Sequence, residues 1–219
     1  MTVRSRPATH SVFVNCPFDE DYKELFDVLI FAVHDCGFYV RCALESRDSG
    51  EIRFQKICQL IRQCRYGIHD LSRTQLDSAN QLPRFNMPLE LGLFLGAKEF
   101  GQTRRLRKVC LVLDTEQFRY QKFCSDLAGV DIEAHDNQPR NLVRVVRNWL
   151  QANQGRSSPR ARPMIIPDWS VIFQRYQEFL ETLPYLCREH RLNYRELQFP
   201  EYVVLIEAWL REHDWRPTT

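Results

Sequence analysis

The sequence predicts an α/β fold: a flavodoxin-like, five-stranded parallel sheet in the order 2-1-3-4-5, with helices on both faces and a C-terminal helical appendage. Two observations support this fold. Short β-branched and aromatic runs alternate five times with longer amphipathic segments. The alternation also extends over roughly 150 residues, which is the usual size of one domain. Because parallel strands need crossover connections, alternating strands and helices favour a sheet that is covered on both sides.

The expected strands are short apolar runs bounded by turn-forming residues. The first, "SVFVNCPF", breaks at a proline and is typical of a buried strand. The later runs "FYVRCAL", "RYGIHDL", "KVCLVLD" and "VDIEAHD" follow the same pattern. The five runs occupy residues 11–18, 38–44, 65–71, 108–114 and 130–136.

The segments between these runs carry apolar residues at helical spacing. The first one, "DEDYKELFDVLIFAVHDCG", has acids in its first turn and a terminal glycine, which are start and stop signals of a helix. The five expected helices lie at 19–37, 51–64, 84–98, 115–129 and 141–154.

Composition divides the chain into a polar tail (1–10), the α/β domain (11–154), a linker (155–167) and a C-terminal helical segment (168–219). The linker contains "GRSSPRARP", which is typical of a connecting segment. The C-terminal segment shows two amphipathic helix patterns and no strand pattern. These helices could pack on the main domain or form a homo-oligomer, and the sequence does not separate the two.

Composition and motifs also exclude several classes of function. A net charge of +2 gives no field that indicates nucleic acid or membrane as a partner. The N-terminus has no apolar signal region, and the eight cysteines stand singly without zinc spacing, so we expect a cytoplasmic protein without a metal site. The absence of a P-loop, GxGxxG, GxSxG or HExxH argues against ATPase, dehydrogenase, hydrolase and protease activities of those types.

Three polar clusters are expected to meet at one edge of the sheet. In an open parallel sheet, ligands bind outside the carboxyl ends of the strands where the strand order reverses, here between the first and third strands. The residues that follow these strands are 15–19 and 70–73. The loop after the third strand then leads into 86–90, at the start of the next helix. We therefore expect these segments to line one crevice.

The stretch "RFNMPLELGLFLGAK" places a lone carboxylate, Glu90, among apolar residues. Asn86 is a suitable N-cap and Pro88 is tolerated in a first turn, so Glu90 is expected in that turn, where the helix dipole keeps it ionised by roughly 0.3–1 kcal/mol. Gly92 and Gly96 indicate close approach of a neighbouring element or of a flat ligand. The alternative is that Glu90 only supports its helix start and that the glycines serve helix–sheet packing.

Such a carboxylate can attack or stabilise an anomeric carbon while an N-glycosidic bond breaks, because the transition state has oxocarbenium character. A second acid, Asp70 or Asp19, could hold ribose hydroxyls or assist a proton transfer. Phe18 or Phe85 could stack on a base, although packing is the commoner role of such residues. Arginine suits nucleotide phosphates, and the candidates near the crevice are Arg41, Arg73 and Arg84.

The segments "SVFVNCPFD", "GIHDLSR" and "RFNMPLELGLFLGAK" together resemble the TIR-like and nucleoside 2-deoxyribosyltransferase-like superfamily, over roughly residues 11–150. In that superfamily the first strand ends in a small-Pro-Phe turn, the third ends in Asp-x-Ser, and the next helix opens with an ELG that carries the catalytic glutamate. The resemblance implies that Glu90 is this glutamate and that Asp70 and Ser72 line the sugar pocket. It also implies a substrate-binding loop formed by Asn15, Pro17, Phe18 and Asp19. Asn86 and Met87 are expected to bind substrate because the start of their helix lines the same crevice.

The expected function is therefore cleavage of an N-glycosidic bond in a nucleotide, with NAD as a substrate rather than a cofactor. The resemblance implies a role in bacterial antiphage defence, by NAD depletion or by an ADP-ribose signal. Two alternatives stay open. One is a nucleoside or nucleotide hydrolase or 2-deoxyribosyltransferase, and the other is a non-catalytic nucleotide sensor whose C-terminal helices pass the signal to a partner.

Overall fold

The computed structural model describes residues 7–46, 48–73, 85–101, 107–127, 129–154 and 164–215. Arg84 and most of the predicted linker lie outside the described residues.

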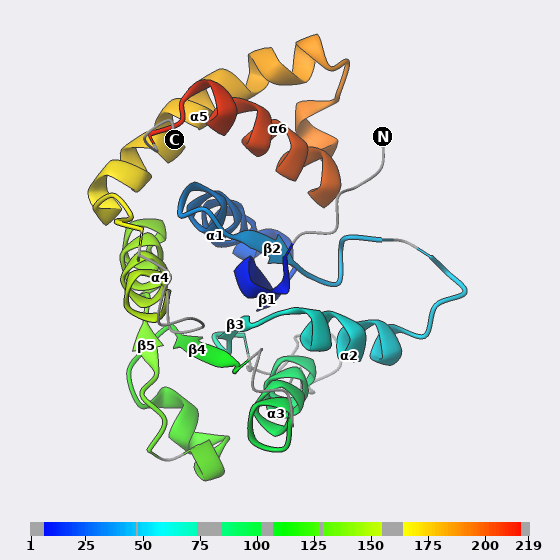
Figure 1. The fold of residues 1–219 in the computed structure, drawn as a ribbon, viewed down its shortest axis with the longest axis vertical. Coiled ribbons are helices and arrows are strands. Elements are labelled where there is room, and N and C mark those ends of the chain that lie inside the picture. The colour runs from blue at the N-terminus through cyan, green and yellow to red at the C-terminus, as the bar shows by residue number, and fades with distance from the viewer. Residues whose placement is uncertain are drawn as a thin grey trace.

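Five parallel strands form one sheet in the order β2-β1-β3-β4-β5, which confirms the predicted fold class and strand order (Figure 1). At its centre, β1 pairs with β3 so that Asn15 stands opposite His69. Every residue of β1 and β3 is buried, as expected for parallel strands covered on both faces. The strands are β1 (Ser11–Asn15), β2 (Tyr39–Arg41), β3 (Tyr66–Asp70), β4 (Val109–Asp114) and β5 (Glu133–Ala134).

Two pairs of helices cover the two faces of the sheet (Figure 1). Helices α1 (Lys23–Asp35) and α4 (Pro139–Asn153) pack together on one face. Helices α2 (Arg53–Gln63) and α3 (Asn86–Glu99) pack on the other. The long apolar stripe of α1 is buried because the C-terminal helices cover it from outside.

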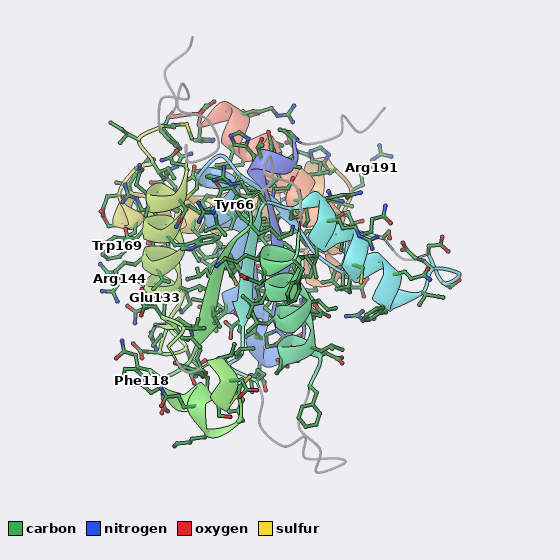
Figure 2. All side chains as sticks on the ribbon, turned by 60° about the horizontal axis from the view of Figure 1, so that its bottom comes forward. Tyr66, Phe118, Glu133, Arg144, Trp169 and Arg191 are labelled. Atoms are coloured by element: carbon green, nitrogen blue, oxygen red, sulfur yellow. The ribbon has the colours of Figure 1, made fainter. Side chains whose placement is uncertain are left out.

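The connection between β4 and β5 differs from the prediction. The expected helix at 115–129 is wrong: the described part of this segment forms two short 3₁₀ helices, η4 (Arg119–Lys122) and η5 (Ser125–Leu127). Phe118, exposed away from the sheet in Figure 2, has φ of 63°, which is incompatible with a continuous right-handed helix. The side chain of Tyr120 is buried and donates to the carbonyl of Val130 at 3.1 Å, so tertiary contacts hold this shape.

The C-terminal helices α5 (Trp169–Glu189) and α6 (Phe199–Glu212) form an outer layer over α1 (Figure 1). The ring of Phe31 on α1 lies 5.3 Å from that of Phe179 and 5.8 Å from that of Trp209. Arg175 adds a bidentate pair to Asp35, at 3.0 and 3.1 Å. Of the two alternatives for these helices, packing on the main domain is thus observed.

The end of the predicted linker is held against α4. Arg147 donates to the carbonyl of Pro167 at 2.7 Å, and the buried Ile166 donates its N–H to the side chain of Gln151 at 2.8 Å. In Figure 2, Arg144 on α4 and Trp169 at the start of α5 lie on the same side of the molecule. Among the described residues, no helix has the length and apolar character needed to cross a bilayer.

Candidate active site

The carboxyl edge of the sheet brings the three predicted segments together around Cys16, just after β1. The thiol is buried, and burial is the main reason that its pKa is raised well above the usual value. The charges of Asp70, Glu90 and Asp19 raise that pKa further. Carboxylates from the end of β3, from α3 and from the first loop therefore lie within electrostatic reach of one buried side chain.

Asn15 fixes the start of α3 relative to the sheet. Its side-chain amide donates to Nδ1 of His69 at 3.0 Å and to the carbonyl of Met87 at 2.9 Å. Burial lowers the pKa of His69 to about 3, so the ring is neutral and accepts this bond at Nδ1. Met87 itself is buried in the apolar cluster that contains Leu91. Asn15 and Met87, both predicted to bind substrate, are thus used to position the helix that carries Glu90.

Asp70 is enclosed rather than exposed to a ligand. The side chain is 0% exposed and receives hydrogen bonds from the hydroxyl of Tyr22 and from the N–H of Ser72, the latter at 2.8 Å. His135 lies 3.0 Å away through Nε2. Burial alone would raise the pKa of Asp70, but the bonds from His135, Ser72 and Tyr22 outweigh it and lower that pKa. This geometry supports a positioning role for Asp70 and does not support the predicted contact with a sugar.

Sequence reasoning missed the partners of Asp70. Nδ1 of His135 accepts the backbone N–H of Asn137 at 3.1 Å, and its Nε2 lies 3.0 Å from a carboxylate oxygen of Asp70. Tyr22 comes from the turn η2 (Glu20–Tyr22) before α1, and His135 follows β5. Both come from the carboxyl edge of the sheet, which is the one signal in the sequence that could have indicated them.

Of the acids Asp19, Asp70 and Glu90 at the described part of this edge, Glu90 is the one without a hydrogen-bond or ion-pair partner among the described residues. The residue is half-buried. Burial raises the pKa of Glu90 to about 7, and the charge of Arg53 at the start of α2 lowers it by a smaller amount. Exposed apolar side chains lie at the starts of α2 and α3, namely Ile52, Phe54, Phe85 and Leu89.

Two expectations about Glu90 require correction. The N-cap of α3 is Phe85 instead of Asn86, and no side chain caps this helix. Glu90 therefore falls beyond the first turn, where the dipole acts weakly. Burial raises the pKa of Glu90 to about 7, so the carboxylate is not held ionised by the helix dipole in the way that the sequence analysis expected.

The two glycines of α3 do not serve internal packing among the described residues. A Cβ added at Gly92 would meet nothing within 4 Å, and one at Gly96 would only touch Phe100, at 3.9 Å. Within the described parts of the chain, neither a neighbouring element nor helix–sheet packing accounts for these positions. Gly92 itself is exposed.

The remaining predicted ligands lie in several places. Pro17 and Ser72 are buried. Arg41 bonds Glu45 at 2.6 Å, so it is directed to its own loop. Arg73 lies 3.8 Å from Asp19 at the rim of the first loop.

Phe18 turns away from Glu90. Its ring packs edge-on against that of Phe26 on α1, at 5.3 Å, and lines a separate cavity of about 870 Å³ beneath the C-terminal helices. Asp19 lines the same cavity and accepts the N–H of Tyr22 at 3.1 Å. The predicted first loop thus borders two sites, with Cys16 towards Glu90 and Phe18 towards this cavity.

Comparison with known sequences does not assign the chain to a family. No family model matches it, and no curated protein matches it at a significant level. The described residues contain no cluster of His, Cys, Asp or Glu suited to a metal, and all eight cysteines are free. The resemblance in the three segments therefore stays a prediction.

Proposed function

We propose that this protein is a cytoplasmic enzyme that cleaves the N-glycosidic bond of a nucleotide, with NAD as its substrate and Glu90 as the carboxylate that acts on the sugar. The observation that supports this best is the state of Glu90. It is a half-buried acid at the carboxyl edge of a parallel sheet, and no described residue pairs with it. Acids that are desolvated without a partner cluster at functional sites.

NAD suits a site whose described residues include an acid without a partner, Glu90. Breaking the bond between ribose and nicotinamide builds positive charge on the sugar ring, which a nearby carboxylate stabilises. Nicotinamide leaves as a neutral molecule, because its ring nitrogen is positively charged in NAD, so the reaction needs no acid to protonate it. Ionised Glu90 is then sufficient, and the enclosed Asp70 takes no part in the chemistry. Arg53 is exposed beside Glu90 and is available to a phosphate.

The pKa of Glu90 favours one alternative, a nucleoside or nucleotide hydrolase or a 2-deoxyribosyltransferase. A purine or pyrimidine base must be protonated as it leaves, unlike nicotinamide. With a pKa of about 7, a large fraction of Glu90 is protonated at neutral pH and can supply this proton. The two reactions therefore use opposite protonation states of the same side chain.

The test is product analysis with a matched pair of variants. Purified protein is incubated with NAD or with deoxynucleosides, and nicotinamide and free bases are separated by chromatography. We expect nicotinamide release that falls by about 10²–10⁴-fold in Glu90→Gln and is unchanged in Glu99→Gln, an exposed acid on the same helix. Release of free base alone would identify the alternative reaction. Nucleotide binding without any product would instead indicate a sensor and overturn the proposal.

The proposal includes a homo-oligomer. The C-terminal helices bury one face on α1, and their outer surface carries exposed apolar side chains at Val171, Tyr185 and Val204. Self-association through this surface would make specific activity rise with protein concentration. In a bacterial cell the reaction would deplete NAD or produce an ADP-ribose signal, the role in antiphage defence that the resemblance implies.

A further inference from the structure

A second site lies between the α/β domain and the C-terminal helices. The cavity of about 870 Å³ is bounded on one side by the first loop and the start of α1. On the other side it is bounded by α5, the turn η6 (Tyr194–Glu196) and the start of α6. Neither Glu90 nor Asp70 lines it. Its volume lies in the range of pockets that hold small molecules, roughly 300–1,000 Å³.

The wall combines a buried apolar floor with aromatic rings near the surface. Ile30 and Leu183 are almost fully buried at the floor. Phe18 is 37% exposed and Tyr194 is 50% exposed, on opposite sides of the cavity, and Phe199 adds a third ring. Exposed aromatic faces of this kind are suited to flat apolar groups and to cations.

The charge of the wall is negative. The carboxylates that line the cavity outnumber the two cations, Lys23 and Arg195. Three further charges lie beside the wall: Arg41 is next to Glu45, and Arg73 is shared between Asp19 and the exposed Asp21. Together with two helix N-termini that each count as about half a positive charge, they reduce this imbalance without reversing its sign. The five carboxylates are Asp19, Glu20, Asp27, Glu45 and Glu201.

We propose that this cavity binds a small organic cation with an apolar or aromatic body. A phosphate group would meet a negative wall in a confined space, where the field is strongest, so the cavity does not suit a nucleotide. A positively charged group would be attracted by the carboxylates and by the faces of the aromatic rings. The proposal is independent of the reaction at Glu90, because no residue of the Glu90 helix takes part in this wall.

The cavity can be tested with three probes of similar size: benzyltrimethylammonium, benzyl alcohol and phenyl phosphate. The full chain is labelled at leucine methyl groups and titrated with each probe to millimolar concentration in NMR experiments. The wall contains four reporters, Leu44, Leu180, Leu183 and Leu197, and Leu91 in a different apolar cluster serves as the control. We expect the wall signals to shift, with the tightest binding for the cation and the weakest for phenyl phosphate.

Two matched pairs of variants locate the binding. Tyr194→Ala removes a wall ring, and Tyr185→Ala removes a ring of similar exposure that is not on the wall. Glu20→Gln removes a wall charge, and Glu24→Gln removes an exposed charge one turn away that is also not on the wall. We expect the first member of each pair to weaken cation binding by about two- to fivefold and the second to leave it unchanged. Absence of shifts with all three probes, preference for phenyl phosphate, or equal effects within the pairs would overturn the proposal.

Discussion

Replacing Glu90 by Gln should stabilise the fold, and the gain should depend on pH. The pKa of Glu90 stands at about 7 in the fold, against 4.5 for an unperturbed glutamate. Each pH unit between these values corresponds to about 1.4 kcal/mol, so keeping the carboxylate ionised in the native state costs at most about 3.5 kcal/mol. Since the side chain is half-buried and partly hydrated, we expect a gain of about 1–3 kcal/mol from Gln at pH 8.

The direction of this pH dependence follows from proton binding to Glu90. Between about pH 4.5 and 7 the native protein holds a proton on Glu90 that the unfolded chain has lost, so native stability falls as pH rises through this window. Gln has no such dependence. The difference between variant and wild type should therefore be small near pH 4 and complete near pH 8.

The assay is urea unfolding followed by circular dichroism, at several pH values, on wild type, Glu90→Gln and Glu99→Gln. Glu99 lies at the exposed end of the same helix and controls for the loss of a surface charge. If the gain from Glu90→Gln did not change with pH, or if this variant were the less stable at pH 8, the described state of Glu90 would be refuted.

Three further predictions follow from the same geometry. Arg53→Gln should raise the pKa of Glu90 and move the pH midpoint of activity up by about half a unit to one unit. Arg62→Gln, at the far end of α2, is the control and should leave the midpoint unchanged. Equal midpoints in the two variants would contradict this prediction. Asn15→Ala should lower the free energy of unfolding by about 1–3 kcal/mol, because it leaves Nδ1 of His69 and the carbonyl of Met87 unpaired. An unchanged midpoint in urea unfolding would disprove the positioning role of Asn15. Gly92→Ala should be stabilising by about 0.5–1 kcal/mol in the same assay, since an added Cβ meets nothing; a loss of stability would show that this face is covered.

Much of the fold was predictable because most of its strands and helices have a recognisable local sequence pattern. The strand order follows from five alternating elements and the need for crossover helices, and the described sheet has that order. The prediction of a helix at 115–129 was wrong because the sequence pattern there is helical, whereas tertiary contacts determine the conformation. Arg119 pairs with Asp114 at the end of β4. Phe118 adopts a left-handed backbone conformation, which the local sequence pattern does not predict.

The candidate site was predictable in its location and less so in its roles. That Asp70 and Glu90 come from strand and helix ends at one edge follows from topology. Which of them is enclosed depends on Tyr22 and His135, two partners distant in sequence. The turn of Phe18 away from Glu90 depends in the same way on Phe26 and the helices beyond it, which the sequence did not place.

The most direct test of the central claim is the pH dependence of kcat/KM for NAD. If ionised Glu90 acts on the sugar, cleavage should rise with pH through a single midpoint near 7, gaining about tenfold between pH 6 and pH 8. This dependence should disappear, together with nearly all activity, in Glu90→Gln. A rate that is flat or falls over this range in the wild type, or that is unchanged in the variant, would contradict the account.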